Sequence, residues 1–551
     1  MRFPTAGGIV RAAVLIGSIT VLARIVGFGR TVTFSQTVTT SCLSQAYFTA
    51  NQIPNIIFEL VVGGALAGMV VPVLAGPVER GAREEVRRTT SALLTWIVVL
   101  LLPVSALAAL TAGPLLNLLV RGAAPPCDRA DIIDVGARML VVFAPQILLY
   151  GLAVVLYGVL QAHRRFTGPA LAPLVSSLVV IGAYVAYVPV MAGASPNALA
   201  TLPQAAELTL SAGTTLGVLA LVVTGVVAAW PLRLAIRPTL RFPPGVAARV
   251  RRLAGAGLAT VVAQQIAMLA VVVLTNRYGT NGALADYNYA WALYLLPWAI
   301  LAVPIATSAF PMLSARTAAD APDDRPEGGA ANGTQDRAAF DRIAAATTRA
   351  VVLASCAGAA ALAAVAEPAA RVFDGGPQGR PEVLARAVLA FAPGLLGYGL
   401  VAHLGRVLYA CGRARAAAVA IVIGWTGVLV ADVAVAIVVP ADWVVAALGL
   451  GNTIGMSVAG GLLLVALGRA RGRAALAGFG RAALAGLFAG VAGALAGYGC
   501  ARGLDMSGRP ANLGVAALAA VIAGGVYLAI SYVIDRRDLR AALSRGVDKR
   551  R

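Results

Sequence analysis

One 23-residue stretch of the chain reads Phe143-Ala-Pro-Gln-Ile-Leu-Leu-Tyr-Gly-Leu-Ala-Val-Val-Leu-Tyr-Gly-Val-Leu-Gln-Ala-His-Arg-Arg165, and it recurs without gaps as Phe391 to Arg413. Twelve of the 23 positions are identical, including Phe-Ala-Pro at the start and Tyr-Gly-Leu in the middle. Chance similarity between two helices rich in Ala, Leu and Val is the alternative. Chance alone would not align Phe, Pro and Tyr without gaps, so the stretch indicates an internal duplication.

The composition around this repeat is that of a membrane protein. Of 551 residues, 59% are hydrophobic and 12% are charged, with a mean hydropathy of +0.83. A soluble protein carries about 25% charged residues. Apolar stretches of about 20 residues, long enough to cross a bilayer, recur along the chain. The sequence predicts an all-α integral membrane protein of about 14 transmembrane helices, over residues 12–36, 46–75, 89–112, 134–161, 168–192, 210–232, 253–276, 284–312, 344–366, 383–410, 416–439, 443–467, 482–501 and 512–534.

The repeat divides this series into two lobes. Its copies lie in the fourth and tenth predicted helices, which are six apart and share one orientation, so the duplication is parallel, about an axis along the membrane normal. We expect a six-helix N-terminal lobe at 1–235 and a six-helix C-terminal lobe at 236–467. Two extra helices and a basic tail follow at 468–551. The polar loop 315–342, with mixed charge and several Gly and Pro residues, is predicted to be disordered.

The net charge of +20 is distributed in a way that favours a membrane over nucleic acid as partner. Alternate loops together with both chain ends hold 31 of the 44 Lys and Arg residues, and the intervening loops hold seven. This positive-inside pattern predicts that both termini are cytoplasmic. The first apolar stretch carries Arg24 and Arg30 and is not followed by a small-residue cleavage site. We therefore expect it to stay as a helix and not to be removed as a signal peptide.

The five cysteines are too few and too scattered for a metal site or a disulfide framework. Cys42 and Cys127 both fall in predicted external loops, where a disulfide is permitted. Whether they are bonded is left open by the sequence. No GxxxxGK[ST] nucleotide-binding loop occurs, and we expect neither a metal nor another cofactor.

Ionisable side chains inside membrane helices are costly and usually face a cavity or one another. Arg24 and Arg30 flank Gly27-Phe-Gly29, and six residues of ideal helix would turn them about 120° apart. The two glycines permit bending or unwinding that would bring both toward one cavity. Guanidinium groups suit bidentate contacts with phosphate oxygens. In the alternative interpretation, Arg30 reaches an interface and Arg24 pairs with a carboxylate.

Four further residues complete the candidate set. Asn55 and Glu59 lie four apart on a predicted helix that Pro54 can bend, and so share a face. The alternative is a helix bent for packing, with Glu59 neutral or salt-bridged. Gln265 is a further substrate-binding candidate. Asp432 is an ion-coupling candidate, and its alternative is an acid at the membrane interface.

Several motifs in order along the chain resemble one family. They are Arg24-Ile-Val-Gly-Phe-Gly-Arg30, Ala46-Tyr, Ile53-Pro-Asn-Ile-Ile57, Gly63-Gly-Ala-Leu66, Val71-Pro-Val-Leu74, Phe143-Ala-Pro-Gln, Phe166 with Pro169, Asn288-Tyr-Ala290 and Val407-Leu-Tyr-Ala410. The sequence resembles the MurJ (MviN) family of lipid II flippases, within the superfamily of multidrug, oligosaccharide and polysaccharide exporters, and in particular its high-GC Gram-positive branch. The resemblance implies that Arg24 and Arg30 line a cationic cavity. Many members have an acidic residue at the position of Gln45 and arginines at the positions of Phe58, Glu59 and Ala292. The resemblance therefore implies a cavity that is less cationic here than in those members.

The resemblance also implies a function. The chain would be a transporter and not an enzyme, moving lipid II from the cytoplasmic to the outer leaflet of the inner (plasma) membrane during peptidoglycan synthesis. Its partners would be lipid II, membrane lipid and the cell-wall synthesis machinery. The alternatives are an exporter of another polyprenyl-linked glycan or of drugs, a membrane glycosyltransferase, and a scaffold that transports nothing. The short external loops, poor in acids, disfavour the glycosyltransferase.

Overall fold

The computed structural model describes residues 6–61, 70–243, 246, 258–318, 330–374, 379–504, 506 and 508–534, and these residues form helices and connecting turns without a β-strand. Contacts divide the chain into two units. Unit 1 comprises residues 1–265 and 275–285, and unit 2 comprises residues 266–274 and 286–551. The predicted lobe boundaries at 235 and 467 stay predictions.

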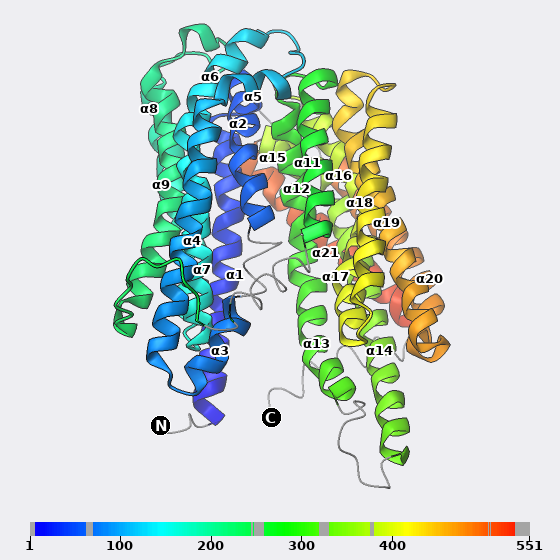
Figure 1. Cartoon of the computed structure of the whole chain (residues 1–551). Coiled ribbons are helices and arrows are strands. Elements are labelled where there is room, and N and C mark those ends of the chain that lie inside the picture. The colour runs from blue at the N-terminus through cyan, green and yellow to red at the C-terminus, as the bar shows by residue number, and fades with distance from the viewer. Residues whose placement is uncertain are drawn as a thin grey trace. The chain divides into compact units, whose positions relative to one another are not determined.

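Unit 1 contains nine helices that lie wholly within it among the described residues, and Figure 1 colours them blue to green. They are α1 (Ala6–Thr37), α2 (Cys42–Glu59), α3 (Val70–Glu79), α4 (Arg83–Leu110), α5 (Ala112–Leu119), α6 (Arg129–Phe143), α7 (Pro145–Ala162), α8 (Thr167–Val190) and α9 (Gln204–Ala229). Helix α8 packs on α1 and α9, and α7 packs on α4 and α9. Apolar side chains such as Leu93, Ile97 and Val155 form the core between α4 and α7.

Helix α11 (Leu258–Tyr278) has its ends in unit 1 and its middle in unit 2. Helix α12 (Ala283–Pro297) begins in unit 1 and continues in unit 2. The helices that follow in unit 2 are α13 (Val303–Ala318), α14 (Ala330–Ala364), α15 (Ala366–Asp374), α16 (Pro381–Phe391), α17 (Gly394–Ala410), α18 (Ala414–Ala436), α19 (Val444–Arg471), α20 (Phe479–Gly503) and α21 (Arg509–Ile534). Helix α19 packs on α17 and α18, and α20 packs on α14 and α21. Short turns of helix occur at Leu199–Thr201, Trp230–Leu232, Trp298–Ala302, Ala441–Trp443 and Arg473–Leu476.

The duplicated stretch breaks its helix at the same point in both units. Helix α6 ends at Phe143 and α7 begins at Pro145, while α16 ends at Phe391 and α17 begins at Gly394, after Pro393. A hydroxyl binds a backbone carbonyl at each break. Ser105 Oγ donates to Ala144 O at 2.7 Å, and Thr453 Oγ1 donates to Ala390 O at 2.7 Å. These matching breaks support the duplication, because proline interrupts the helical hydrogen bonds at equivalent places.

The described part of the chain has eleven helices long and apolar enough to cross a membrane, or twelve if α16 and α17, bent by 46°, form one span. The predicted count of about 14 is therefore not confirmed. The span predicted over 46–75 corresponds to two shorter helices, α2 with 18 residues and α3 with ten. Helix α2 is also rich in polar residues, and the residues 62–69 between the two helices lie outside the described chain.

The prediction of disorder over the whole of 315–342 is wrong at both ends. Helix α13 continues to Ala318 and α14 begins at Ala330, and residues 319–329 lie outside the described chain. Alanine, which is frequent in both helical segments, has the highest helix propensity. Packing stabilises α14 further. Phe340 is buried beneath the Arg471 guanidinium, and Arg471 pairs with Asp341 at 3.0 Å.

Candidate substrate-binding site

Arg24 and Arg30 both lie on α1, which runs as an unbroken helix through Gly27 and Gly29. The unwinding that the two glycines permit is not found. Instead, hydroxyls one turn further on bind the glycine carbonyls, and Thr33 Oγ1 donates to Gly29 O at 2.9 Å. With the helical spacing kept, the two guanidinium groups leave α1 in directions about 120° apart.

Arg24 is exposed, and it has no hydrogen bond or ion pair with any residue in the described ranges. Glu59, the last residue of α2, is also exposed and forms no ion pair with Arg24 there. The alternative interpretation, in which Arg24 is paired structurally with Glu59, therefore finds no support. A lone guanidinium on a membrane helix is costly unless it reaches water or an anion. The exposed position of Arg24 suits a side chain that binds an anionic ligand.

Arg30 is half-buried beside a set of tyrosines from three other helices of unit 1. It interacts electrostatically with Tyr47 of α2, Tyr150 of α7 and Tyr184 of α8. The hydroxyls of Tyr47 and Tyr184 are 2.9 Å apart, and Tyr47 also lies 2.8 Å from Thr214 Oγ1. Tyr47 and Tyr184 are buried, and their hydroxyl groups are bonded within this set of residues.

Tyr150 connects this arginine to the end of α2. Its ring lies 4.3 Å, centroid to centroid, from that of Phe58, and it interacts electrostatically with both Arg30 and Glu59. Tyr150, which the prediction missed, thus interacts electrostatically with two residues of the predicted set. The sequence contained a feature that could have identified Tyr150, because it is the tyrosine of the repeated Tyr-Gly-Leu.

Two other predicted residues lie in unit 1 without a direct link to the arginines. Asn55 is half-buried on α2, one turn before Glu59, and Gln265 of α11 is 5% exposed. No hydrogen bond joins either residue to Arg24 or Arg30 in the part of the chain that the structure describes. Their assignment to the binding site stays a prediction.

Asp432 lies in unit 2, on α18, and is fully buried. Neither of its carboxylate oxygens has a hydrogen-bond partner among the described residues. It faces Gly451 of α19, where a Cβ would lie 2.0 Å from Asp432 Oδ1, so only glycine leaves room for the carboxylate. The side chain is thus enclosed by protein, and the roles predicted for Asp432 stay predictions.

The fold is that of a multi-pass helical membrane protein with two helical units. The family profile described as lipid II flippase MurJ matches residues 34–499. The chain belongs to the MurJ family.

Curated relatives carry the same family name. A probable lipid II flippase MurJ of Rhizobium tropici is 25% identical over 177 residues, 32% of each chain. Another, of Synechocystis sp., is 27% identical over 169 residues, 31% of this chain and 30% of the relative. Each alignment thus covers about a third of the relative's own length.

Solved structures share the fold. A lipid II flippase MurJ in an inward closed conformation matches with a TM-score of 0.70 and 17% identity, covering 95% of this chain and 99% of the other. An inward-facing multidrug resistance MATE family transporter of the MOP superfamily matches with a TM-score of 0.60 and 16% identity, covering 84% and 98%.

Proposed function

We propose that this protein is a lipid II flippase, which moves a polyprenyl-diphosphate sugar from the cytoplasmic to the outer leaflet. The observation that carries the proposal is Arg24, an exposed guanidinium on α1 without a described protein partner, in a chain of the MurJ family whose sequence predicts that this helix spans the membrane. A diphosphate is a fitting ligand, because a guanidinium group can bind two phosphate oxygens at once and keeps its charge at any physiological pH.

In this proposal Arg24 and Arg30 bind the diphosphate from two directions. The half-buried Tyr150 supplies a hydroxyl donor for phosphate or sugar oxygens, and Glu59 and Asn55 offer acceptors for sugar hydroxyls. The lipid tail stays in the bilayer while the two lobes alternate in access, so no covalent bond is made or broken. Moving a headgroup of charge −2 through the membrane field costs or yields about 2.3 kcal/mol per charge per 100 mV.

Asp432 is proposed to couple transport to an ion. A buried carboxylate without a hydrogen-bond partner is unfavourable as an anion, so it tends to take up a proton or a cation. The carboxylate packs directly on Gly451, where a Cβ would lie 2.0 Å from Asp432 Oδ1, so a side chain at that position would displace it. Uptake and release of a cation at Asp432 would make the free energy of one transport state depend on the ion gradient.

We further propose that the protein lies in the plasma (inner) membrane with both termini cytoplasmic, as the distribution of its basic residues predicts. An association with the cell-wall synthesis machinery also stays a prediction. A disulfide between Cys42 and Cys127 supports the orientation, because disulfides persist on the oxidising, external side of the membrane.

The test is depletion of the protein in its host, with identification of the lipid-linked precursor that accumulates, followed by translocation assays in vesicles. The proposal expects lipid II to accumulate on the inner leaflet and the purified protein to flip it. Accumulation of a different polyprenyl-linked glycan, or efflux of a drug without flipping, would point to the other exporters. Normal precursor levels after depletion would favour the scaffold.

A further inference from the structure

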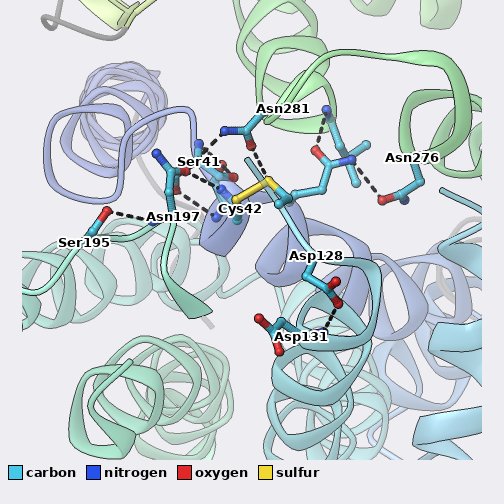
Figure 2. The surroundings of a disulfide bond; sticks show 12 residues. Ser41, Cys42, Asp128, Asp131, Ser195, Asn197, Asn276 and Asn281 are labelled. Atoms are coloured by element: carbon cyan, nitrogen blue, oxygen red, sulfur yellow. Dashed lines mark hydrogen bonds between the residues drawn. A yellow bond between two sulfur atoms is a disulfide. The ribbon is translucent and has the colours of Figure 1, made fainter. Parts of the chain in front are cut away.

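Four connections at one end of unit 1 meet around a disulfide (Figure 2). Cys42, the first residue of α2, is bonded to Cys127, in the loop between α5 and α6, with their Cα atoms 5.5 Å apart. The disulfide that the sequence permitted is therefore present. It joins the start of α2 to a loop 85 residues further along the chain.

Two asparagines extend this link to the other two connections. Asn197, between α8 and α9, accepts hydrogen bonds at its Oδ1 from Cys42 N at 3.0 Å and from Asn281 Nδ2 at 3.2 Å. Asn281, in the turn between α11 and α12, has its Oδ1 2.9 Å from Cys127 Sγ. A disulfide sulfur carries no proton, so this last approach is a contact and not a hydrogen bond.

The turn between α11 and α12 fits tightly against this assembly. Gly282 has a φ of +75°, and a Cβ there would lie 2.3 Å from Thr40 Cγ2, so both the conformation and the space require glycine. Gly122, in the loop that holds Cys127, approaches the carbonyl oxygens of Asn276 and Arg277, to which its Cβ would be 3.4 Å away. The disulfide loop therefore covers the end of α11.

Neutral amides hold the same turn from the side of α2. Gln45 Nε2 donates to Asn276 Oδ1 at 2.9 Å, and Asn276 Nδ2 donates to Thr49 Oγ1 at 3.1 Å. Leu284 N donates to Gln45 Oε1 at 3.3 Å. None of these groups titrates near neutral pH, so the attachment responds to pH little, whereas the disulfide beside it responds to redox conditions.

We propose that the Cys42–Cys127 disulfide is a redox-sensitive latch that holds the α11–α12 turn on unit 1. Oxidation fixes the loop around Cys127 so that it covers Asn276, Arg277 and Asn281. Reduction frees that loop, and a Cys127 thiol, a weak donor, cannot replace the covalent link. The latch deepens the proposed function and rests on it. The turn leads into α12, which continues in unit 2. Release of the turn would therefore free the start of α12 to move during the change in access that transport requires.

The chemistry is thiol–disulfide exchange with a dithiol. Cys127 is half-buried and Cys42 is fully buried, so the incoming thiolate attacks Cys127 Sγ and Cys42 leaves as a thiolate that then takes up a proton. The second thiol of the dithiol displaces Cys127 from the mixed disulfide. Two electrons and two protons pass to the protein, and the dithiol becomes a disulfide.

The test is hydrogen exchange of the turn 275–285 in the full-length protein, followed by mass spectrometry, before and after treatment with dithiothreitol. We expect exchange of this turn to rise about tenfold on reduction, and similarly in Cys127→Ser. Cys356→Ser, which removes a buried cysteine far along the chain on α14, serves as the control and should leave it unchanged. After reduction a maleimide should label Cys127 well before Cys42.

A second variant avoids dependence on the cysteines. Asn281→Ala, with the disulfide intact, should also raise exchange of the turn. The proposal is overturned if Cys127 becomes labelled by maleimide while exchange of the turn stays the same. A parallel flipping assay separates the two proposals. Faster exchange with no flipping in either redox form refutes the transport function alone, and unchanged exchange with normal flipping refutes the latch alone.

Discussion

Phe143 and Phe391, 248 residues apart in the chain, occupy equivalent places in the two units. Both are fully buried at the last residue of a helix that breaks before a second one begins. Each ring meets a tyrosine at a steep angle, Tyr47 at a centroid distance of 5.5 Å and Tyr287 at 5.7 Å. The duplicated sequence has thus kept one packing arrangement twice, since an aromatic anchor stabilises each break.

The first prediction concerns these anchors. Phe143→Ala and Phe391→Ala should each lower the free energy of unfolding by about 3 kcal/mol, because each leaves a cavity beside a tyrosine ring. Unfolding in detergent or nanodiscs, followed by intrinsic fluorescence, measures the change. Phe166→Ala is the matched control, since that ring is 45% exposed. An equal loss of stability in the control would contradict the assignment.

Arg24 gives the second prediction. Arg24→Ala should abolish flipping while protein abundance stays near normal, because no described protein contact depends on its side chain. Arg24→Lys should restore only part of the activity, since an ammonium group cannot bind two oxygens in a planar fork. Abundance and lipid II flipping are measured together. Full activity in Arg24→Ala would disprove the binding role.

A double variant tests the pairing of Arg24 with Glu59 directly. If the two were a structural ion pair, Arg24→Ala/Glu59→Ala should be more abundant and more active than either single variant, because each single variant leaves one unpaired charge. The absence of such a pair from the described residues predicts no rescue. Improved abundance in the double variant would restore the structural interpretation.

Asp432 carries the third prediction. Asp432→Asn removes the charge with almost no change in volume, so folding should be retained while the response of flipping to an imposed ion gradient is lost. Flipping is measured in vesicles with and without proton or sodium gradients. Asp442→Asn, at a half-exposed acid paired with Arg386, is the control and should keep the response. Retention of a full response in Asp432→Asn would exclude ion coupling at this residue.

The fourth prediction concerns orientation. A cysteine introduced as Ala200→Cys, between α8 and α9, should react with an impermeant maleimide in intact cells. Arg165→Cys, in the turn between α7 and α8, should react only after permeabilisation. Both positions are exposed in the structure. The reverse pattern would invert the orientation inferred from the basic loops.

Some of the site could be predicted and some could not. Arg24, Arg30 and Asp432 were identified because a charge within an apolar stretch is conspicuous in any sequence. Tyr150 was missed, because tyrosine is common in membrane helices and its electrostatic interaction with Arg30 depends on how distant helices of unit 1 fold together. Gly27 and Gly29 permit bending or unwinding, but α1 stays helical through both, because glycine permits such a change and does not cause it.

The sequence by itself determined the helical membrane class, the duplication and the family resemblance. Hydropathy, charge placement and repeated residues are properties of the linear chain, and the bilayer imposes the same length and polarity on every span. Only the tertiary structure decided that Cys42 and Cys127 are bonded, that Asp432 is enclosed opposite Gly451, and that α13 and α14 extend into the loop expected to be disordered. Each of these depends on which distant segments pack together, and packing is not encoded at a single position.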